Sequence, residues 1–273
     1  ATPIPRTLAL TIYGDLDLSV VDQMPSGRKP VITEIVPPSP DDRDRVYEDI
    51  RKRLDEGRQG YVICPRIDEP DETKERAIQV KSVTAEAARL AKGELKGYRI
   101  EVMHSKMTKS KKEEVMNRFY EHEIDVLVST SVVEVGVNVP NATSIIIEGA
   151  ERFGLAQLHQ LRGRVIRSNH QAYCYLFADA KSDKTVERLN AIVEAKNGFE
   201  LAEMDLSLRG AGDLAGQKQW GMSDLAMEAI KNIKMVEYAR DEAKNIIEND
   251  EALESHPELQ EVMNQDSYHI HFE

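Results

Sequence analysis

The chain has 273 residues, of which 41% are hydrophobic, and a formal net charge of -12 at pH 7. An acidic protein of this kind cannot bind nucleic acid over its whole surface, so any polyanion site must be a local patch. The sequence contains neither an apolar stretch of about 18 residues nor a charged leader before an apolar segment, so we expect no membrane span and no signal peptide.

The chain has two cysteines, and both lie inside apolar runs. Cys64 is part of GYVICP and Cys174 is part of AYCYLF. This placement favours two buried, reduced thiols of a cytoplasmic protein over a disulfide.

Short runs rich in β-branched residues recur along the first 180 residues, with helical patterns between them. This alternation is typical of an α/β domain, in which a parallel sheet is covered by helices on both faces. The predicted strands are 31–36, 60–64, 98–103, 125–130, 143–148 and 172–177.

Three segments between these runs have the apolar spacing of amphipathic helices. The first spans residues 39–57, with Ser39 or Asp41 as its N-cap. The second spans residues 82–97, although Gly93 weakens it, and the third follows the cap residue Thr108. The acidic segment 66–75 is predicted to be a polar loop.

After residue 180 the strand signals stop and only helical patterns remain. Two helical segments, 182–198 and 223–250, are joined by a glycine-bearing connector at 199–221. We therefore predict an α/β domain at 31–180, preceded by a linker segment at 1–30 and followed by a helical appendage at 181–273.

Arg162, Arg164 and Arg167 lie close together in a segment, 153–178, that contains no Asp or Glu. Such guanidinium groups can bind a phosphate group in a bidentate manner. The alternative is that they are cations at a helix C-terminus, stabilised by the helix dipole. The charge pattern alone leaves both interpretations open.

Two further segments follow predicted strands, namely 104–107 and 129–143. Ligands of open α/β sheets bind beyond the carboxyl ends of the strands, so we expect these segments and the arginine segment to meet at one edge. Alternatively, 129–143 is a buried loop and His104 is a hydrogen-bonded histidine at a strand end. No Cys and His spacing typical of a metal site is present, and there is no G-x-x-x-x-G-K-[ST] phosphate-binding loop.

Four segments resemble superfamily 2 helicase motifs III, IV, V and VI in their sequences and in their order along the chain. They are ATPIPRT (1–7), GYVICPRIDE (60–69), VLVSTSVVEVGVNVPNAT (126–143) and QLHQLRGRVIR (157–167). With FELAEMDLSLRGAGDL (199–214), they resemble the RecG family of bacterial ATP-dependent DNA helicases, which remodel stalled replication forks. The last segment resembles a translocation motif that this family shares with the transcription-repair coupling factor.

The resemblance implies a second RecA-like motor domain followed by a helical hairpin. The wedge domain and the first motor domain, which would hold most of the ATP and Mg²⁺ contacts, would lie upstream. The expected partners are branched or forked double-stranded DNA and those upstream domains, in the bacterial cytoplasm at the nucleoid. Because the phosphate-binding loop is absent, we expect the chain alone to hydrolyse no ATP.

By motif position, the resemblance implies a role for each candidate residue. The expected catalytic residues are the arginine fingers Arg164 and Arg167 with Gln160. The expected nucleotide contacts are Glu134, Gly136 and Asn138. The expected DNA-backbone contacts are Ser129, Thr130, His104 and Lys106. The residues expected to couple cleft closure to movement along DNA are Arg209, Gly210, Gly212, Gln217 and Gln219.

The chain departs from the family pattern at a few positions. Ile166 and Ser168 replace the usual glycines, and a β-branched residue adopts a positive φ only at a cost. Asn138 replaces the commoner aspartate. Two other interpretations stay open, namely the motor domain of a transcription-repair coupling factor and a non-catalytic α/β module that binds a phosphorylated or protein ligand.

Overall fold

The computed structural model describes residues 29–65, 72–130, 139–165, 169–195, 197–215, 233–250 and 252–266. The chain divides into two compact units. Of the described residues, those up to Leu208 form the first unit and those from Arg209 onwards belong to the second. Among the helices that the structure describes, none is both long enough and apolar enough to cross a membrane.

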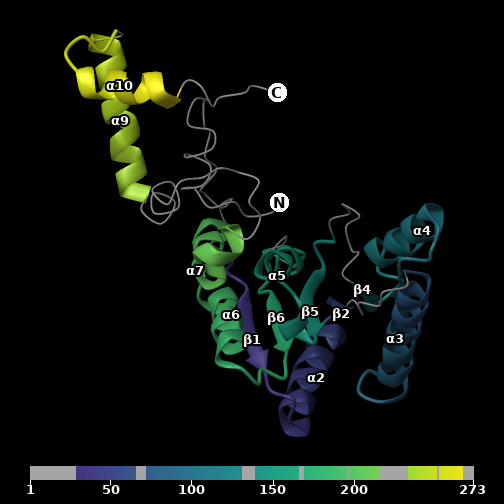
Figure 1. Cartoon of the computed structure of the whole chain (residues 1–273). Helices are drawn as coiled ribbons and strands as arrows, with labels where there is room; N and C mark the ends of the chain where they lie inside the picture. Colours follow the sequence, from purple (N-terminus) through teal and green to yellow (C-terminus); the bar gives the residue numbers. More distant parts are fainter. Residues whose placement is uncertain are drawn as a thin grey trace. The chain divides into compact units, whose positions relative to one another are not determined.

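The first unit is built on a six-stranded sheet in which every pair of neighbours is parallel (Figure 1). Its strands are β1 (Ile32–Val36), β2 (Gln59–Cys64), β3 (Ile100–Met103), β4 (Val126–Thr130), β5 (Ala142–Glu148) and β6 (Tyr173–Phe177). Their order across the sheet is β1-β6-β5-β2-β4-β3. Every strand predicted from the sequence is present, with ends within two residues of those expected.

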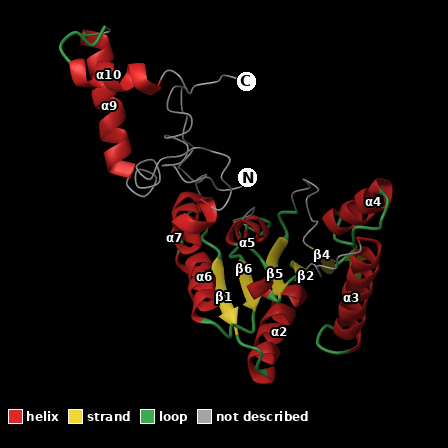
Figure 2. Cartoon of the chain, viewed as in Figure 1, coloured by secondary structure: helices red, strands yellow, loops and turns green. Residues whose placement is uncertain are grey.

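Helices cover both faces of the sheet (Figure 2). One face carries α2 (Pro40–Asp55) and α3 (Glu72–Lys92), and the other carries α4 (Lys109–Tyr120), α5 (Leu155–Arg162) and α6 (Asp183–Glu194). Each face therefore has its own apolar core, with Tyr47 and Leu90 in one and Phe119, Leu158 and Ile192 in the other. This arrangement confirms the predicted RecA-like α/β fold.

Local sequence explains where α2 and α4 begin. The side chain of Ser39 accepts a hydrogen bond from the N–H of Asp42, and Pro40 occupies the first turn of α2. Thr108 accepts a hydrogen bond from the N–H of Lys111 in the same way at α4. Gly57, with φ at +78°, follows the end of α2, as expected of a residue that tolerates the left-handed region.

Two predictions from the sequence are wrong in extent. Helix α3 begins at Glu72, so part of the predicted polar loop is helical, because Glu, Lys and Arg favour helices as well as solvent. The predicted connector at 199–221 begins as a helix, α7 (Gly198–Ala215), whose first turn is capped by the side chain of Asn197. Leu201 and Ala202 of α7 are buried, and Leu201 belongs to the same apolar core as α4, α5 and α6.

The second unit contains α9 (Ile233–Asn249) and α10 (Pro257–Asp266). Asp250 ends α9 and organises the turn between them, because its carboxylate accepts the N–H groups of Glu254 and Ser255 at 2.9 and 2.8 Å. These hydrogen bonds hold the pKa of Asp250 below its usual value. The turn is therefore fixed by one side chain.

Both cysteines are free and buried, as predicted. Burial raises the pKa of the Cys64 thiol, and of the Cys174 thiol, to about 12. Thiols in this state are poor nucleophiles at neutral pH.

A buried glutamine joins β2 to the loops beside it. The side-chain amide of Gln59, which is 0% exposed, donates to the carbonyls of Phe119 at 2.6 Å and Ile124 at 2.7 Å. Its oxygen accepts from the amide of Asn141 at 3.1 Å, and Asn141 also donates to Gly57. One side chain therefore satisfies polar groups that three segments bury together.

Replacing this glutamine should destabilise the sheet unit. In Gln59→Leu the carbonyls of Phe119 and Ile124 lose their donor, and each buried unsatisfied group costs about 1–3 kcal/mol. We expect the free energy of unfolding to fall by about 2 kcal/mol or more, measured by urea denaturation followed by circular dichroism. The matched change at an exposed amide, Asn117→Leu, should alter it by less than about 0.5 kcal/mol. Equal stability of the two variants would contradict the role given to Gln59.

Candidate functional site

Polar side chains gather at the carboxyl edge of the sheet, where β3, β4 and β2 end next to one another. Met103 lies opposite Ser129, and Cys64 lies opposite Thr130. His104, which follows Met103, therefore lies beside Thr130. Parallel pairing thus brings together the candidate DNA contacts of the two separate segments.

Several polar atoms at this edge are enclosed without a hydrogen-bond partner. They are Oγ1 of Thr130, Nδ1 of His104 and Oγ of Ser105, and none bonds to any residue that the structure describes. Buried polar groups are normally paired, so these three atoms are candidates for hydrogen bonds to a ligand. The hydroxyl of Ser129 differs, because it donates to the carbonyl of Thr130 at 2.6 Å.

Lysines lie close to His104 at this edge, although Lys111 pairs with Glu114 at 2.9 Å. Helix α4 starts directly after this edge, and its first turn contains Lys111 but no acid. The backbone N–H groups and dipole of a helix N-terminus attract anions, and Lys106 is exposed in the turn before it. Burial lowers the pKa of His104, and the charges of Lys106 and Lys112 lower it further. His104 therefore presents a neutral imidazole among lysines at pH 7.

Arg162, the first arginine of the cluster, has a structural role. It is only 7% exposed, and its guanidinium donates to the carbonyl of Ile192 in the last turn of α6 and lies 3.4 Å from Nδ1 of His159. Burial lowers the pKa of Arg162. Burial, with the neighbouring guanidinium charge, lowers the pKa of His159 to about 4. Arg162 therefore fastens the end of α5 to the end of α6.

The sequence led us to expect the arginine segment beside His104 and Thr130 at the carboxyl edge. The structure does not place it there. Helix α5 follows β5 through the short helix η1 (Ala150–Arg152), and its eight residues cover about 12 Å, roughly the length of a strand. Its end meets Ile192, at the end of a helix that also starts from the carboxyl edge. Arg164, half-buried just beyond α5, and the exposed Gln160 thus lie toward the amino ends of the strands.

Several predicted site residues lie outside the residues that the structure describes. They are Glu134, Gly136, Asn138, Arg167, Gln217 and Gln219, together with Ile166 and Ser168. The backbone of Arg209, Gly210 and Gly212 is helical, as part of α7.

The sequence reasoning missed some residues at the carboxyl edge. Glu148 ends β5 and pairs with Arg43 of α2 at 2.8 Å, while burial raises its pKa. Ser105, next to His104, has a buried hydroxyl without a partner among the described residues, and the charge of Lys112 lowers the pKa of His104. Two signals in the sequence could have identified Glu148 and Ser105. Glu148 is an acid at the end of the apolar run TSIIIE, and Ser105 is a polar residue just after a predicted strand. Within the described ranges, no three His, Cys, Asp or Glu side chains are grouped so as to hold a metal ion.

Comparison with known proteins identifies the domains. The model of the helicase conserved C-terminal domain matches residues 42–169. The model of domain 3, C-terminal, of the ATP-dependent DNA helicase RecG matches residues 195–268. The chain is 44% identical over its whole length to the ATP-dependent DNA helicase RecG of Staphylococcus epidermidis, and 46% identical over 92% of its length to that of Bacillus subtilis.

A solved structure of RecG bound to a three-way DNA junction is 41% identical and has a TM-score of 0.66. It matches 87% of this chain, which covers 30% of that protein. The chain spans 39% and 36% of the two curated relatives.

The fold and the matched domain show that this chain contains the C-terminal domain of a superfamily 2 helicase. The second matched domain, at residues 195–268, supports the RecG family over the transcription-repair coupling factor. The chain belongs to the RecG family of ATP-dependent DNA helicases and corresponds to its C-terminal portion.

The electrostatics at the carboxyl edge can be tested by titration. The His104 ring should titrate below its usual pKa of 6.5 in an NMR titration. Lys112→Gln should raise this pKa, whereas Lys96→Gln, before the amino end of β3, should leave it unchanged. Because the unfolded chain takes up this proton first, His104 should contribute stability that is lost as pH falls below about 6.5. A pKa that does not respond to Lys112 would contradict this assignment.

Proposed function

We propose that this chain is the C-terminal motor portion of an ATP-dependent translocase on double-stranded DNA. The whole enzyme would remodel branched DNA such as stalled forks, in the bacterial cytoplasm at the nucleoid. Residues 1–30 would hold the motif III segment and linker, residues 31–180 the second motor domain, and residues 181–273 the helical hairpin, translocation motif and last helices. The domain matches and the related structure with a DNA junction support this proposal.

One observation carries the DNA-binding part of the proposal. The enclosed atoms of Thr130, His104 and Ser105, which have no partner among the described residues, lie at an edge that also presents lysines and a helix N-terminus. Thr130 and Ser105 can donate hydroxyl hydrogen bonds to phosphate oxygens, and Lys106 can neutralise their charge. Such contacts are independent of base sequence, as a translocating motor requires.

The nucleotide part of the proposal rests on the end of α5. Arg164 and Arg167 would act as arginine fingers, which stabilise charge on the transferred phosphoryl group, with Gln160 beside them. Because Arg162 fastens α5 to α6, and α6 leads into α7, a displacement of the fingers would reach the translocation motif directly.

The remaining assigned residues complete the proposed coupling. The nucleotide would also be contacted by Glu134, Gly136 and Asn138. The residues proposed to transmit cleft closure to the duplex are Arg209, Gly210, Gly212, Gln217 and Gln219.

The cofactors would be held mainly by the upstream motor domain. The described residues do not fit Mg²⁺, because they form no cluster of three metal ligands. They fit ATP only as a contact from one side, through Arg164 at the end of α5. ATP, when bound, supplies the free energy of phosphate transfer to water.

The arginine fingers can be tested in the full-length enzyme. Arg164→Ala and Arg167→Ala should keep ATP binding and lower DNA-stimulated kcat by about 10³-fold or more. The exposed Arg152 provides a matched control, and Arg152→Ala should leave kcat unchanged. ATP binding is measured by equilibrium titration and hydrolysis by phosphate release. Undiminished hydrolysis in both finger variants would refute their assignment.

The DNA contacts can be tested by the salt dependence of binding to a branched duplex. Lys106→Gln should reduce the slope of log K against log[salt] by about 1, for every DNA sequence. Thr130→Val, which keeps the shape of the side chain, should weaken binding by about fivefold without changing the slope. Lys96→Gln serves as the control and should alter neither quantity. An unchanged slope for Lys106→Gln would remove this lysine from the DNA interface.

A further inference from the structure

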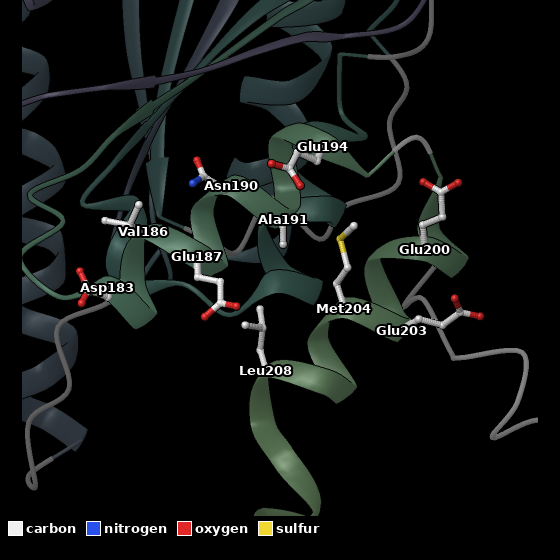
Figure 3. Close-up of a pocket in the computed structure, with 10 residues that line it drawn as sticks. All are labelled: Asp183, Val186, Glu187, Asn190, Ala191, Glu194, Glu200, Glu203, Met204 and Leu208. Carbon is white, nitrogen blue, oxygen red and sulfur yellow. The ribbon is translucent and has the colours of Figure 1, made fainter. Parts of the chain in front are cut away.

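A groove lies between α6 and α7, within the first unit and outside the proposed DNA and nucleotide sites (Figure 3). Its volume is about 670 Å³. Met204 and Leu208 project from α7 toward Ala191 of α6 and form an apolar floor, and Val186, farther along α6, is a further apolar residue of the lining. Val186 is 40% exposed, so the apolar lining is incompletely covered within the part of the chain that the structure describes.

Carboxylates surround the floor. Five of the ten residues that line the groove are acidic, and none of the ten is Lys or Arg. The acidic residues are Asp183, Glu187, Glu194, Glu200 and Glu203. The nearby Arg188 does not line the groove, because its guanidinium donates to the backbone carbonyl of Glu151.

The position of Glu194 carries an electrostatic cost. It lies in the last turn of α6, where the helix dipole disfavours an acid, and this turn contains no basic residue. A cation brought by a partner would offset the unfavourable interaction of Glu194 with the helix dipole.

The charges decide which class of partner fits. DNA is excluded, because a polyanion would meet five carboxylates. A second copy of the chain is disfavoured, because each copy carries a net charge of -12. A helix with one apolar face and flanking Lys or Arg side chains satisfies both the floor and the acidic surround.

We propose that the groove between α6 and α7 binds a basic amphipathic helix of a partner protein. Apolar side chains of that helix cover Met204, Leu208 and Val186, while its cations pair with Asp183, Glu187 and Glu194 of α6. A groove of this volume accommodates several apolar side chains. The surface would recruit a basic protein to the motor without competing for its DNA.

The purified chain can be tested with a fluorescein-labelled helical peptide of about 18 residues, with Leu on one face and Lys on the other. Fluorescence anisotropy should show binding of this peptide, and none of a matched peptide with Glu in place of Lys. Glu187→Lys combined with Glu194→Lys should weaken binding by about tenfold or more. Leu208→Gln should also weaken it, through the apolar floor.

The control is an equal change of charge elsewhere. Glu113→Lys combined with Glu121→Lys, on exposed positions at α4, should leave binding within about twofold. Failure of the Leu/Lys peptide to bind would overturn the proposal. Equal loss in both double variants would also overturn it, because binding would then follow net charge alone. Self-association of the chain that Glu187→Lys and Glu194→Lys abolish would instead identify the occupant as a second copy.

Discussion

Every strand of the sheet hydrogen-bonds to neighbours that run in the same direction, and β2 does so on both sides while all six of its residues are buried. Parallel strands cannot be joined by tight turns, so each connection must cross a face of the sheet. The helices on both faces follow from this constraint. It also places every strand's carboxyl end at one edge, which is why His104 and Thr130 meet although 26 positions separate them in the sequence.

The two halves of the proposed mechanism use opposite ends of the same framework. The polar groups proposed to contact DNA phosphates gather where the strands end, whereas the arginine segment lies beyond a helix that has run back along them. The buried guanidinium of Arg162 holds that helix to α6. A close-packed sheet is stiff, so a displacement at one end of it would be transmitted to the other end and not absorbed.

Much of the fold could be predicted from the sequence, because apolar periodicity and capping residues are local signals. Ser39, Thr108 and the six strands are examples. The start of α3 and the whole of α7 could not, since charged and glycine-containing segments are compatible with both helix and loop. Without α7, the groove beside α6 could not be anticipated either.

The candidate site was predictable only in part, for a different reason. The sequence shows which residues follow strands, and this placed His104 beside Thr130 correctly. It does not show where a helix ends in space, so Arg164 was expected at the wrong edge. Charge alone also cannot separate Arg162, whose partner is a distant carbonyl, from the other arginines.

The two thiols have a practical consequence. The chain contains no cysteine besides Cys64 and Cys174, and both are buried with pKa values near 12. Maleimide reagents modify exposed thiolates, so the wild-type chain should remain unlabelled at neutral pH. A single cysteine introduced on the outside of α5 or α7 could therefore carry a fluorophore or spin label, and report domain movements without prior removal of the native ones.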